Sequence, residues 1–205
     1  MFTGLAFAAA LQTTPAPAPE LTMAPACAYD REAMMALSPD AFDQDLSGGW
    51  RALEQKPGCT ETAADLLADW REAHRAELKI GDLHINYWHE GQLRAGLGQT
   101  QRAVRLLMAG VNPEVQGDGF QEYAIGTVAF LNGDRAGLEA ARARLAATPE
   151  PDNWAETTAS FREKYGVTIK WPMNLEVLDG LIACFGKPYD EAYGGACRSQ
   201  AASAH

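Results

Sequence analysis

Two pairs of glycines constrain the fold of this chain more than any other feature. Gly91 and Gly98 lie seven residues apart, as do Gly126 and Gly133, and each glycine lies 35 residues from its counterpart. A glycine inside a helix costs about 1 kcal/mol relative to alanine, so it is tolerated where two helices must approach closely. At a helix end, glycine supplies the left-handed turn into the next helix. The spacing therefore predicts two similar helix hairpins with Gly98 and Gly133 in their turns.

Apolar residues elsewhere also recur at helical spacing, and no run alternates as a β-strand would. The segment 38–55 is predicted to form one helix that begins at Ser38, and it pairs with a helix that begins at Thr60. Three hairpins are therefore expected over 38–77, 80–112 and 117–149, followed by a helical segment over 150–198. Together they predict a single all-α domain spanning 27–200.

Between residues 38 and 149 the chain resembles the tetratricopeptide repeat family. Paired helices with a period near 34 residues are typical of that family. Its small and large core positions are matched in order by Gly91, Leu97, Gly98, Ala103, Leu107 and Gly110. The third hairpin departs from the pattern, with Leu138 where a small alanine belongs, and the first hairpin repeats at a longer spacing. The resemblance implies a curved array of three hairpins whose last apolar face is covered by 150–198 as a cap.

Four cysteines, Cys27, Cys59, Cys184 and Cys197, bear on the compartment of the protein. None belongs to a Cys-x-x-Cys pair, so zinc ribbons and thioredoxin-type motifs are excluded. An even number of cysteines behind a signal-like segment is typical of disulfides. Pairing of sequence neighbours predicts Cys27–Cys59 and Cys184–Cys197, and the second bond would tie the cap together. Two other connectivities are possible, and four buried thiols in a cytosolic protein are the alternative.

Residues 1–26 combine a small apolar stretch, from Leu5 to Leu11, with a linker rich in proline and alanine. This order resembles a secretory signal, with Ala8 to Ala10 as a cleavage region. No lysine or arginine precedes the apolar stretch, which leaves a cytosolic tail as the alternative. We predict a periplasmic or secreted protein.

The formal net charge of −10 comes from acidic residues spread along the chain. It repels phosphate groups, so nucleic acid and anionic membrane surfaces are unfavourable partners. No apolar run reaches the roughly 20 residues that span a bilayer. The expected partner is a protein or a peptide.

His84, His89 and Glu90 are the first candidates for a metal or acid/base site. Residues five apart in a helix point about 140° away from each other, so the two imidazoles cannot share one ion from a straight helix. Nucleophile and phosphate-binding motifs are also missing from the sequence. We predict no metal, no cofactor and no catalytic residue.

One face of the helix expected over 80–97 is a continuous stripe formed by Ile80, Leu83, Tyr87, Glu90, Arg94 and Leu97. Glu90 and Arg94 are four residues apart, which places a carboxylate beside a guanidinium on an otherwise apolar face. This pattern predicts a structural ion pair. The alternative is a ligand-facing pair or a catalytic acid.

The tetratricopeptide resemblance also implies a binding surface, because the first helices of such hairpins line a concave groove for an extended peptide or a helix. On this chain the groove residues are Ile85, Trp88, Gln92, Tyr123, Thr127 and Phe130. The alternative is that the cap, with Trp171 and Met173, covers this surface and makes it core.

The function predicted from these features is a non-catalytic protein-binding or scaffolding module of the cell envelope. The alternative is a small hydrolase or lyase that uses Glu90 with a histidine. Glu90 facing a histidine across an open pocket would favour the enzyme, whereas an open aromatic groove would favour the binding module.

Overall fold

The computed structural model describes residues 25–115, 117–166 and 168–203. All regular secondary structure in these residues is helical. This confirms the all-α class. The predicted signal-like stretch and cleavage region lie outside the described residues. The elements in chain order are η1 (Pro25–Cys27), α1 (Arg31–Met35), η2 (Asp40–Gln44), α2 (Gly49–Glu54), α3 (Thr60–His74), α4 (Ile80–Gly96), α5 (Thr100–Ala109), α6 (Phe120–Leu131), α7 (Arg135–Ala146), α8 (Trp154–Tyr165), α9 (Leu175–Ala183), α10 (Tyr189–Tyr193) and α11 (Gly195–Ala202).

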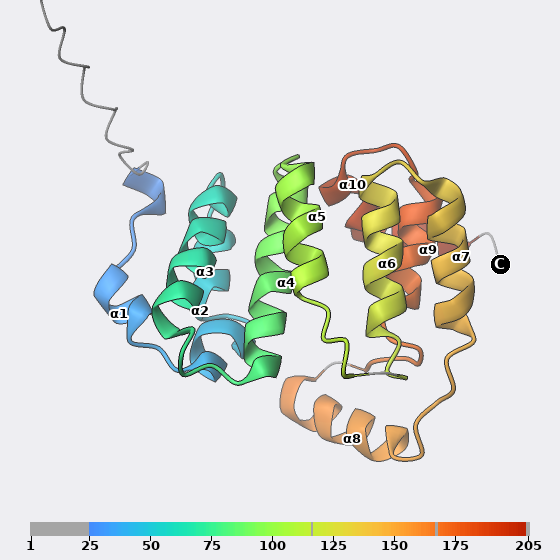
Figure 1. Ribbon diagram of the computed structural model, residues 1–205, viewed down its shortest axis with the longest axis horizontal. Helices are drawn as coiled ribbons and strands as arrows, with labels where there is room; N and C mark the ends of the chain where they lie inside the picture. Colours follow the sequence, from blue (N-terminus) through green and yellow to red (C-terminus); the bar gives the residue numbers. More distant parts are fainter. Residues whose placement is uncertain (1–24, 116, 167, 204–205) are drawn as a thin grey trace, which may run out of the picture.

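The helices from α2 to α7 form a row in which each packs on its neighbour in the chain (Figure 1). The pairs α2/α3, α4/α5 and α6/α7 are the three predicted hairpins. Helix α9 packs against both α6 and α7, and α11 pairs with α9. Helix α8 lies below the row in Figure 1, beside the lower ends of its helices, and contributes no buried residue. The described chain is thus an array of helix pairs that ends in a helical cap, as predicted.

The glycines act largely as their spacing predicts. Gly98 and Gly133 have φ values of 70° and 71°, so both occupy the left-handed turns between helices. A Cβ on Gly91 would lie 3.0 Å from the backbone nitrogen of Leu107, which shows that α4 and α5 approach closely there. Gly126 instead makes room for a side chain, because a Cβ there would lie 2.9 Å from the Leu178 side chain of α9.

The first hairpin differs from the prediction, because residues 38–55 do not form one helix. The Ser38 hydroxyl does accept a hydrogen bond from the Ala41 nitrogen at 3.3 Å, but η2 ends at Gln44. Asp45 then accepts a hydrogen bond from the Ser47 nitrogen at 2.9 Å, and Gly49 has a φ of 52°. A local turn and a positive φ at glycine therefore break the predicted helix.

Both predicted disulfides form. Cys27–Cys59 joins η1 to the start of α3, and Cys184–Cys197 joins the end of α9 to α11. Helix α10 lies inside the loop that the second bond closes. Within the described part of the chain, no helix is long and apolar enough to cross a membrane.

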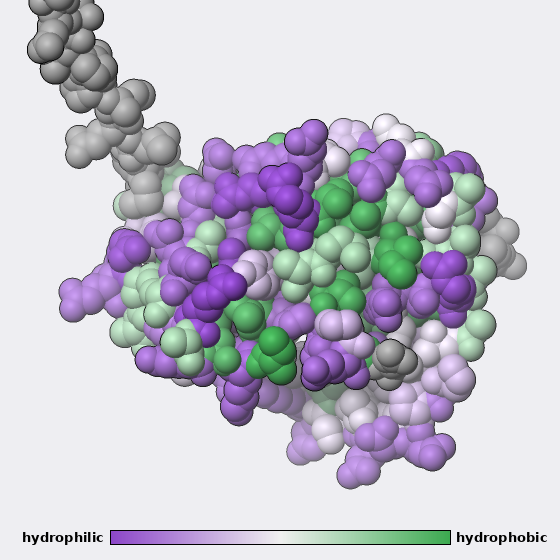
Figure 2. Space-filling view, viewed as in Figure 1, coloured by the Kyte–Doolittle hydropathy of each residue, from purple (hydrophilic) through white to green (hydrophobic). Residues whose placement is uncertain are grey.

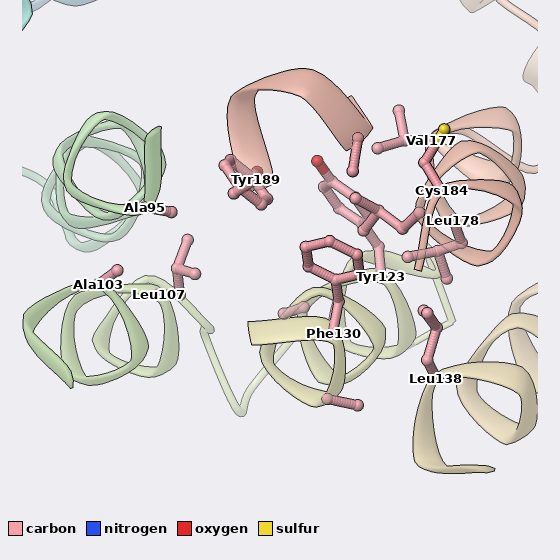
Figure 3. Packing of buried hydrophobic residues seen from close by; sticks show 14 of the residues in the cluster. Ala95, Ala103, Leu107, Tyr123, Phe130, Leu138, Val177, Leu178, Cys184 and Tyr189 are labelled. Atoms are coloured by element: carbon pink, nitrogen blue, oxygen red, sulfur yellow. The ribbon is translucent and has the colours of Figure 1, made fainter. Parts of the chain in front are cut away.

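The buried side chains form two cores. The N-terminal core lies under α2 and α3, where the rings of Phe42 and Trp70 stack with centroids 4.3 Å apart. The C-terminal core lies between α4 to α7 and α9 to α11 (Figure 3). Hydrophilic side chains cover much of the outer face in Figure 2, and hydrophobic ones gather over α5 and α6. Helix α4 lies between the two cores. Its Leu93 packs against the N-terminal core, and its Trp88 and Ala95 belong to the C-terminal core.

Candidate functional site

Glu90 of α4 is fully buried at the contact with α3. Its Oε2 accepts a hydrogen bond from Arg71 Nη2 at 2.7 Å, and its Oε1 accepts one from Arg94 Nε at 3.2 Å and one from Arg102 Nη2 at 2.8 Å. Arg94 also pairs with Asp65 of α3. The predicted Glu90–Arg94 pair is therefore confirmed, as part of a larger network. We call these five residues the Glu90 hub.

The geometry of the Glu90 hub suits a structural ion-pair network and not an acid/base site. Both carboxylate oxygens of Glu90 are occupied by guanidinium donors, and a buried carboxylate is stable only when it is paired in this way. Among the described residues, no histidine hydrogen bonds to Glu90. A general acid or base needs an unoccupied atom within reach of a substrate, and Glu90 offers none here.

The two histidines of α4 are separated by the helix geometry, as expected. His89 Nδ1 lies 2.7 Å from Asp43 Oδ1, whereas His84 borders a small pocket near Gly110. Asp43 also accepts a hydrogen bond from Trp50 Nε1 at 2.6 Å. Within the described ranges, no group of three His, Cys, Asp or Glu side chains is placed to hold a metal ion.

Asp43 is held as a carboxylate in this cluster. Burial alone would raise the pKa of Asp43, but the hydrogen bond and charge of His89 outweigh it, and Trp50 and Arg51 contribute further. The pKa of Asp43 therefore lies below its usual value. His89 Nε2 lies 3.4 Å from Arg51 Nη2, and no described hydroxyl or thiol hydrogen bonds to it. This Asp–His pair joins η2 and α2 to α4 and lacks a nucleophile.

The predicted groove is largely filled. Trp88, Tyr123, Thr127 and Phe130 are only 3%, 2%, 0% and 7% exposed, so the prediction of an open groove is wrong for these four residues. Several elements cover these side chains: Trp88 packs against Phe120 and Tyr123 of α6, and α9 packs along α6. Tyr189 of α10 lies beside Phe130 (Figure 3).

The alternative of a covered surface is therefore right, although the covering residues differ from those expected. Leu178 and Leu181 of α9 and Tyr189 of α10 belong to the core that covers this surface. Trp171 instead donates a hydrogen bond from Nε1 to the Thr148 carbonyl oxygen at 2.9 Å, beside Trp154 of α8.

The other two predicted groove residues lie at different openings. Ile85 borders a small pocket of about 180 Å³ with Val111 and Phe120. Gln92 borders a cleft of about 510 Å³ that lies between α2, α4 and α10. We call this opening the α2–α10 cleft. Its walls include Trp50, Arg51, Glu54, Gln92, Asp190 and Tyr193.

Several tyrosine hydroxyls meet Gln92 at the side of the α2–α10 cleft nearest the core. Gln92 Nε2 lies 3.5 Å from Tyr123 Oη and 3.4 Å from Tyr193 Oη, both at the long limit for a hydrogen bond. The Tyr189 hydroxyl is buried and, among the described residues, has no hydrogen-bond partner, although Gln92 lies close by. We call these four residues the tyrosine cluster.

Burial raises the pKa of Tyr123 and of Tyr189, and the neighbouring Tyr193 adds to both shifts. Both phenols therefore stay neutral at physiological pH and keep a proton to donate and lone pairs to accept. The cluster offers neutral hydrogen-bonding groups that are only weakly engaged with one another.

Comparison with protein-family models, with curated proteins and with solved structures finds no significant match for this chain. The function must therefore be argued from the geometry alone.

Most residues of the α2–α10 cleft could not be recognised from the sequence. Glu54 and Asp190 lie on opposite walls, far apart in sequence, and no local pattern links them. The available signal was Tyr189 and Tyr193, which are four residues apart inside the Cys184–Cys197 loop and so share one face of a short helix. Their spacing could have indicated that α10 covers a neighbouring surface.

Proposed function

We propose that this chain is a non-catalytic binding module of the cell envelope, built on a tetratricopeptide-type helix array, and that an extended segment of a partner protein binds in the α2–α10 cleft. The observation that carries this proposal is the cleft itself. Its volume of about 510 Å³ lies in the range of roughly 300–1,000 Å³ that is typical of ligand sites.

The composition of the cleft suits a peptide. Tyr193 supplies aromatic surface, the buried Trp50 borders the cleft, and Gln92 supplies an amide that can hydrogen bond to a peptide backbone. Aromatic side chains carry a large share of the binding energy at such surfaces. Leu97, which is 37% exposed at the end of α4, extends the apolar wall to the rim.

The envelope location is supported by two observations. Both pairs of cysteines are oxidised, and structural disulfides are typical of proteins outside the cytosol. Residues 1–26 also resemble a secretory signal and its linker.

The alternative of a hydrolase or lyase has no geometric support. It requires Glu90 beside a histidine and an open pocket, but Glu90 is enclosed by arginines. The Asp43–His89 pair does not replace it, because His89 Nε2 faces the Arg51 guanidinium.

Photo-crosslinking tests the proposal. A photoreactive residue at the exposed position Gln55 is expected to capture a protein from the native envelope fraction. Gly96→Phe should abolish the capture, because Gly96 lines the cleft and a Cβ there would make only an ordinary contact, 3.8 Å from Asp190 Cβ. Gly195→Phe is the matched control, since Gly195 is exposed, also has free space around it and lies outside the cleft. Equal capture by the Gly96→Phe variant, or no capture by the parent chain, contradicts the proposal.

A further inference from the structure

The charge of the α2–α10 cleft is unbalanced. Glu54 of α2 and Asp190 of α10 border the cleft, and neither makes an ion pair with a described residue. The next carboxylate in the chain, Glu191, is paired with Lys187 at 2.5 Å. The cleft therefore carries two carboxylates on opposing walls without a cation between them.

Arg51 is the cation on the same wall, but its guanidinium is already engaged. It donates a hydrogen bond to the Asp43 carbonyl oxygen, lies 3.4 Å from His89 Nε2, and stacks 4.2 Å from the ring centroid of Trp50. The carboxylates of Asp43, Asp45 and Glu54 all offset its charge, with Asp43 acting most strongly. The uncompensated charge that faces the cleft is thus negative.

The tyrosine cluster adds acceptors. The Tyr189 hydroxyl makes no hydrogen bond of ordinary geometry with a described residue, although the Gln92 amide lies beside it, and the exposed fraction of Tyr189 is 6%. Gln92 Oε1 accepts no hydrogen bond from any described residue, since Gln92 takes part only as a donor. A buried polar group without a partner is costly, so a donor that reaches both oxygens is favoured.

Buried nitrogens without a partner also occur at Trp70, His84 and Asn86, but of these four residues only Tyr189 lines the α2–α10 cleft. The cleft therefore combines three independent features, which are its open volume, two unpaired carboxylates and an unpartnered buried hydroxyl.

We infer that the α2–α10 cleft selects a lysine side chain of the partner segment. A lysine ammonium has three diverging donors and no acceptor, which suits a cleft lined by hydroxyl, amide and carboxylate groups. Its apolar stem can lie along the ring of Tyr193. Arginine fits less well, because its planar fork suits a single carboxylate bound in bidentate fashion. The net charge of −10 attracts such a basic segment over longer distances.

This inference rests on the proposed function, and a peptide library can test the two separately. The probes are fluorescent eight-residue peptide pools in which one central position is fixed as lysine, N-acetyl-lysine, arginine, leucine or glutamate and the others are mixed. Binding to the full chain is measured by fluorescence anisotropy. The lysine pool is expected to bind at least tenfold more tightly than the acetyl-lysine pool, which keeps the stem but lacks the charge.

Two variants and a control locate the selectivity. Glu54→Gln combined with Asp190→Asn should weaken lysine-pool binding about tenfold, and Tyr189→Phe should weaken it about threefold. The control combines Asp152→Asn with Glu163→Gln, which removes the same charge at exposed positions outside the cleft and should change affinity less than twofold.

The outcomes separate the two claims. Pools that bind without a lysine preference, and lose affinity in the Gly96→Phe variant, overturn the lysine inference but leave the proposed function standing. An equal loss of affinity in the cleft variant and the control variant also overturns the inference. If no pool binds to the parent chain, both claims fail.

Discussion

Glu90 and Gln92 lie two residues apart on α4, yet the two sides of this helix handle polar groups in opposite ways. The Glu90 oxygens accept hydrogen bonds of 2.7 to 3.2 Å from Arg71 of α3, Arg94 of α4 and Arg102 of α5. Gln92 faces α6 and α10, where its hydrogen bonds to tyrosines are 3.4 and 3.5 Å long and its Oε1 is free. The Glu90 carboxylate has hydrogen bonds to both oxygens, whereas Gln92 and the tyrosines beside it can still accept hydrogen bonds.

This difference separates structure from binding within one helix. A saturated buried charge stabilises one helix register and has nothing left for a ligand. The hydroxyls and the amide beside the cleft make only long hydrogen bonds and contribute little to the stability of the fold. A ligand with hydrogen-bond donors would satisfy them. Changes at the hub should therefore reduce stability, whereas changes at the tyrosine cluster should reduce binding.

The largest effect is expected at the hub. Glu90→Ala leaves the buried Arg71 without a carboxylate and Arg94 with Asp65 alone, and should lower the free energy of unfolding by about 4 kcal/mol in urea denaturation. Glu139→Ala serves as the control, because it breaks an exposed pair with Arg135 and should cost no more than about 0.5 kcal/mol. Similar losses of unfolding free energy in the two variants would show that the Glu90 hub stabilises the fold no more than an exposed ion pair does.

The disulfide that anchors α10 comes next. Replacing Cys184 and Cys197 by serine opens a loop with a sequence separation of 13 and should lower the free energy of unfolding by about 3 kcal/mol. Amide hydrogen exchange should rise in α10, since its tie to α9 and α11 is lost, while α3 on the far side of α4 keeps its protection. Unchanged exchange in α10 would mean that Tyr189 packing alone holds it.

A smaller effect is expected at the Asp43–His89 pair. Asp43→Asn should cost about 2 kcal/mol at pH 7, because the buried carboxylate hydrogen bonds to Trp50 and His89. The folded-state pKa of Asp43 is depressed, so its contribution is full above the unfolded pKa of about 3.9 and is lost as the pH falls through the folded-state value. The stability gap between the two proteins should therefore close in acid, and a constant gap would argue against the charged pair.

The smallest stability effect is expected at the tyrosine cluster. Tyr189→Phe removes a hydroxyl that has no partner among the described residues, so the free energy of unfolding should stay within about 1 kcal/mol of the parent value. Chemical denaturation measures this directly. A larger loss of unfolding free energy would show that the hydroxyl stabilises the fold and is not available to a ligand.

The parts of this architecture that depend on local spacing could be predicted from the sequence. Helix periodicity located the hairpins, the glycines located their turns, and a four-residue separation identified the Glu90–Arg94 pair. The two disulfides followed from neighbouring cysteines.

The parts that depend on tertiary contacts could not be predicted. Apolar spacing alone does not reveal that Asp45 turns the chain and breaks the first helix. It also does not distinguish an exposed aromatic face from one that tertiary packing covers. The sequence predicts Trp88 and Tyr123 at a groove, whereas their rings pack on each other between α4 and α6. Helix α10 then packs on α4 beside them. The α2–α10 cleft exists only after that helix has docked.

The central claim is that ligands reach α4 from the α2–α10 cleft and not through the buried aromatic surface. The most direct measurement is a titration of the chain with the lysine-fixed peptide pool, followed by NMR of the tryptophan indole N–H signals. Trp50 lines the cleft and Trp88 is buried in the C-terminal core, so the Trp50 signal should shift while the Trp88 signal stays in place. A shift at Trp88 with none at Trp50 would contradict the account.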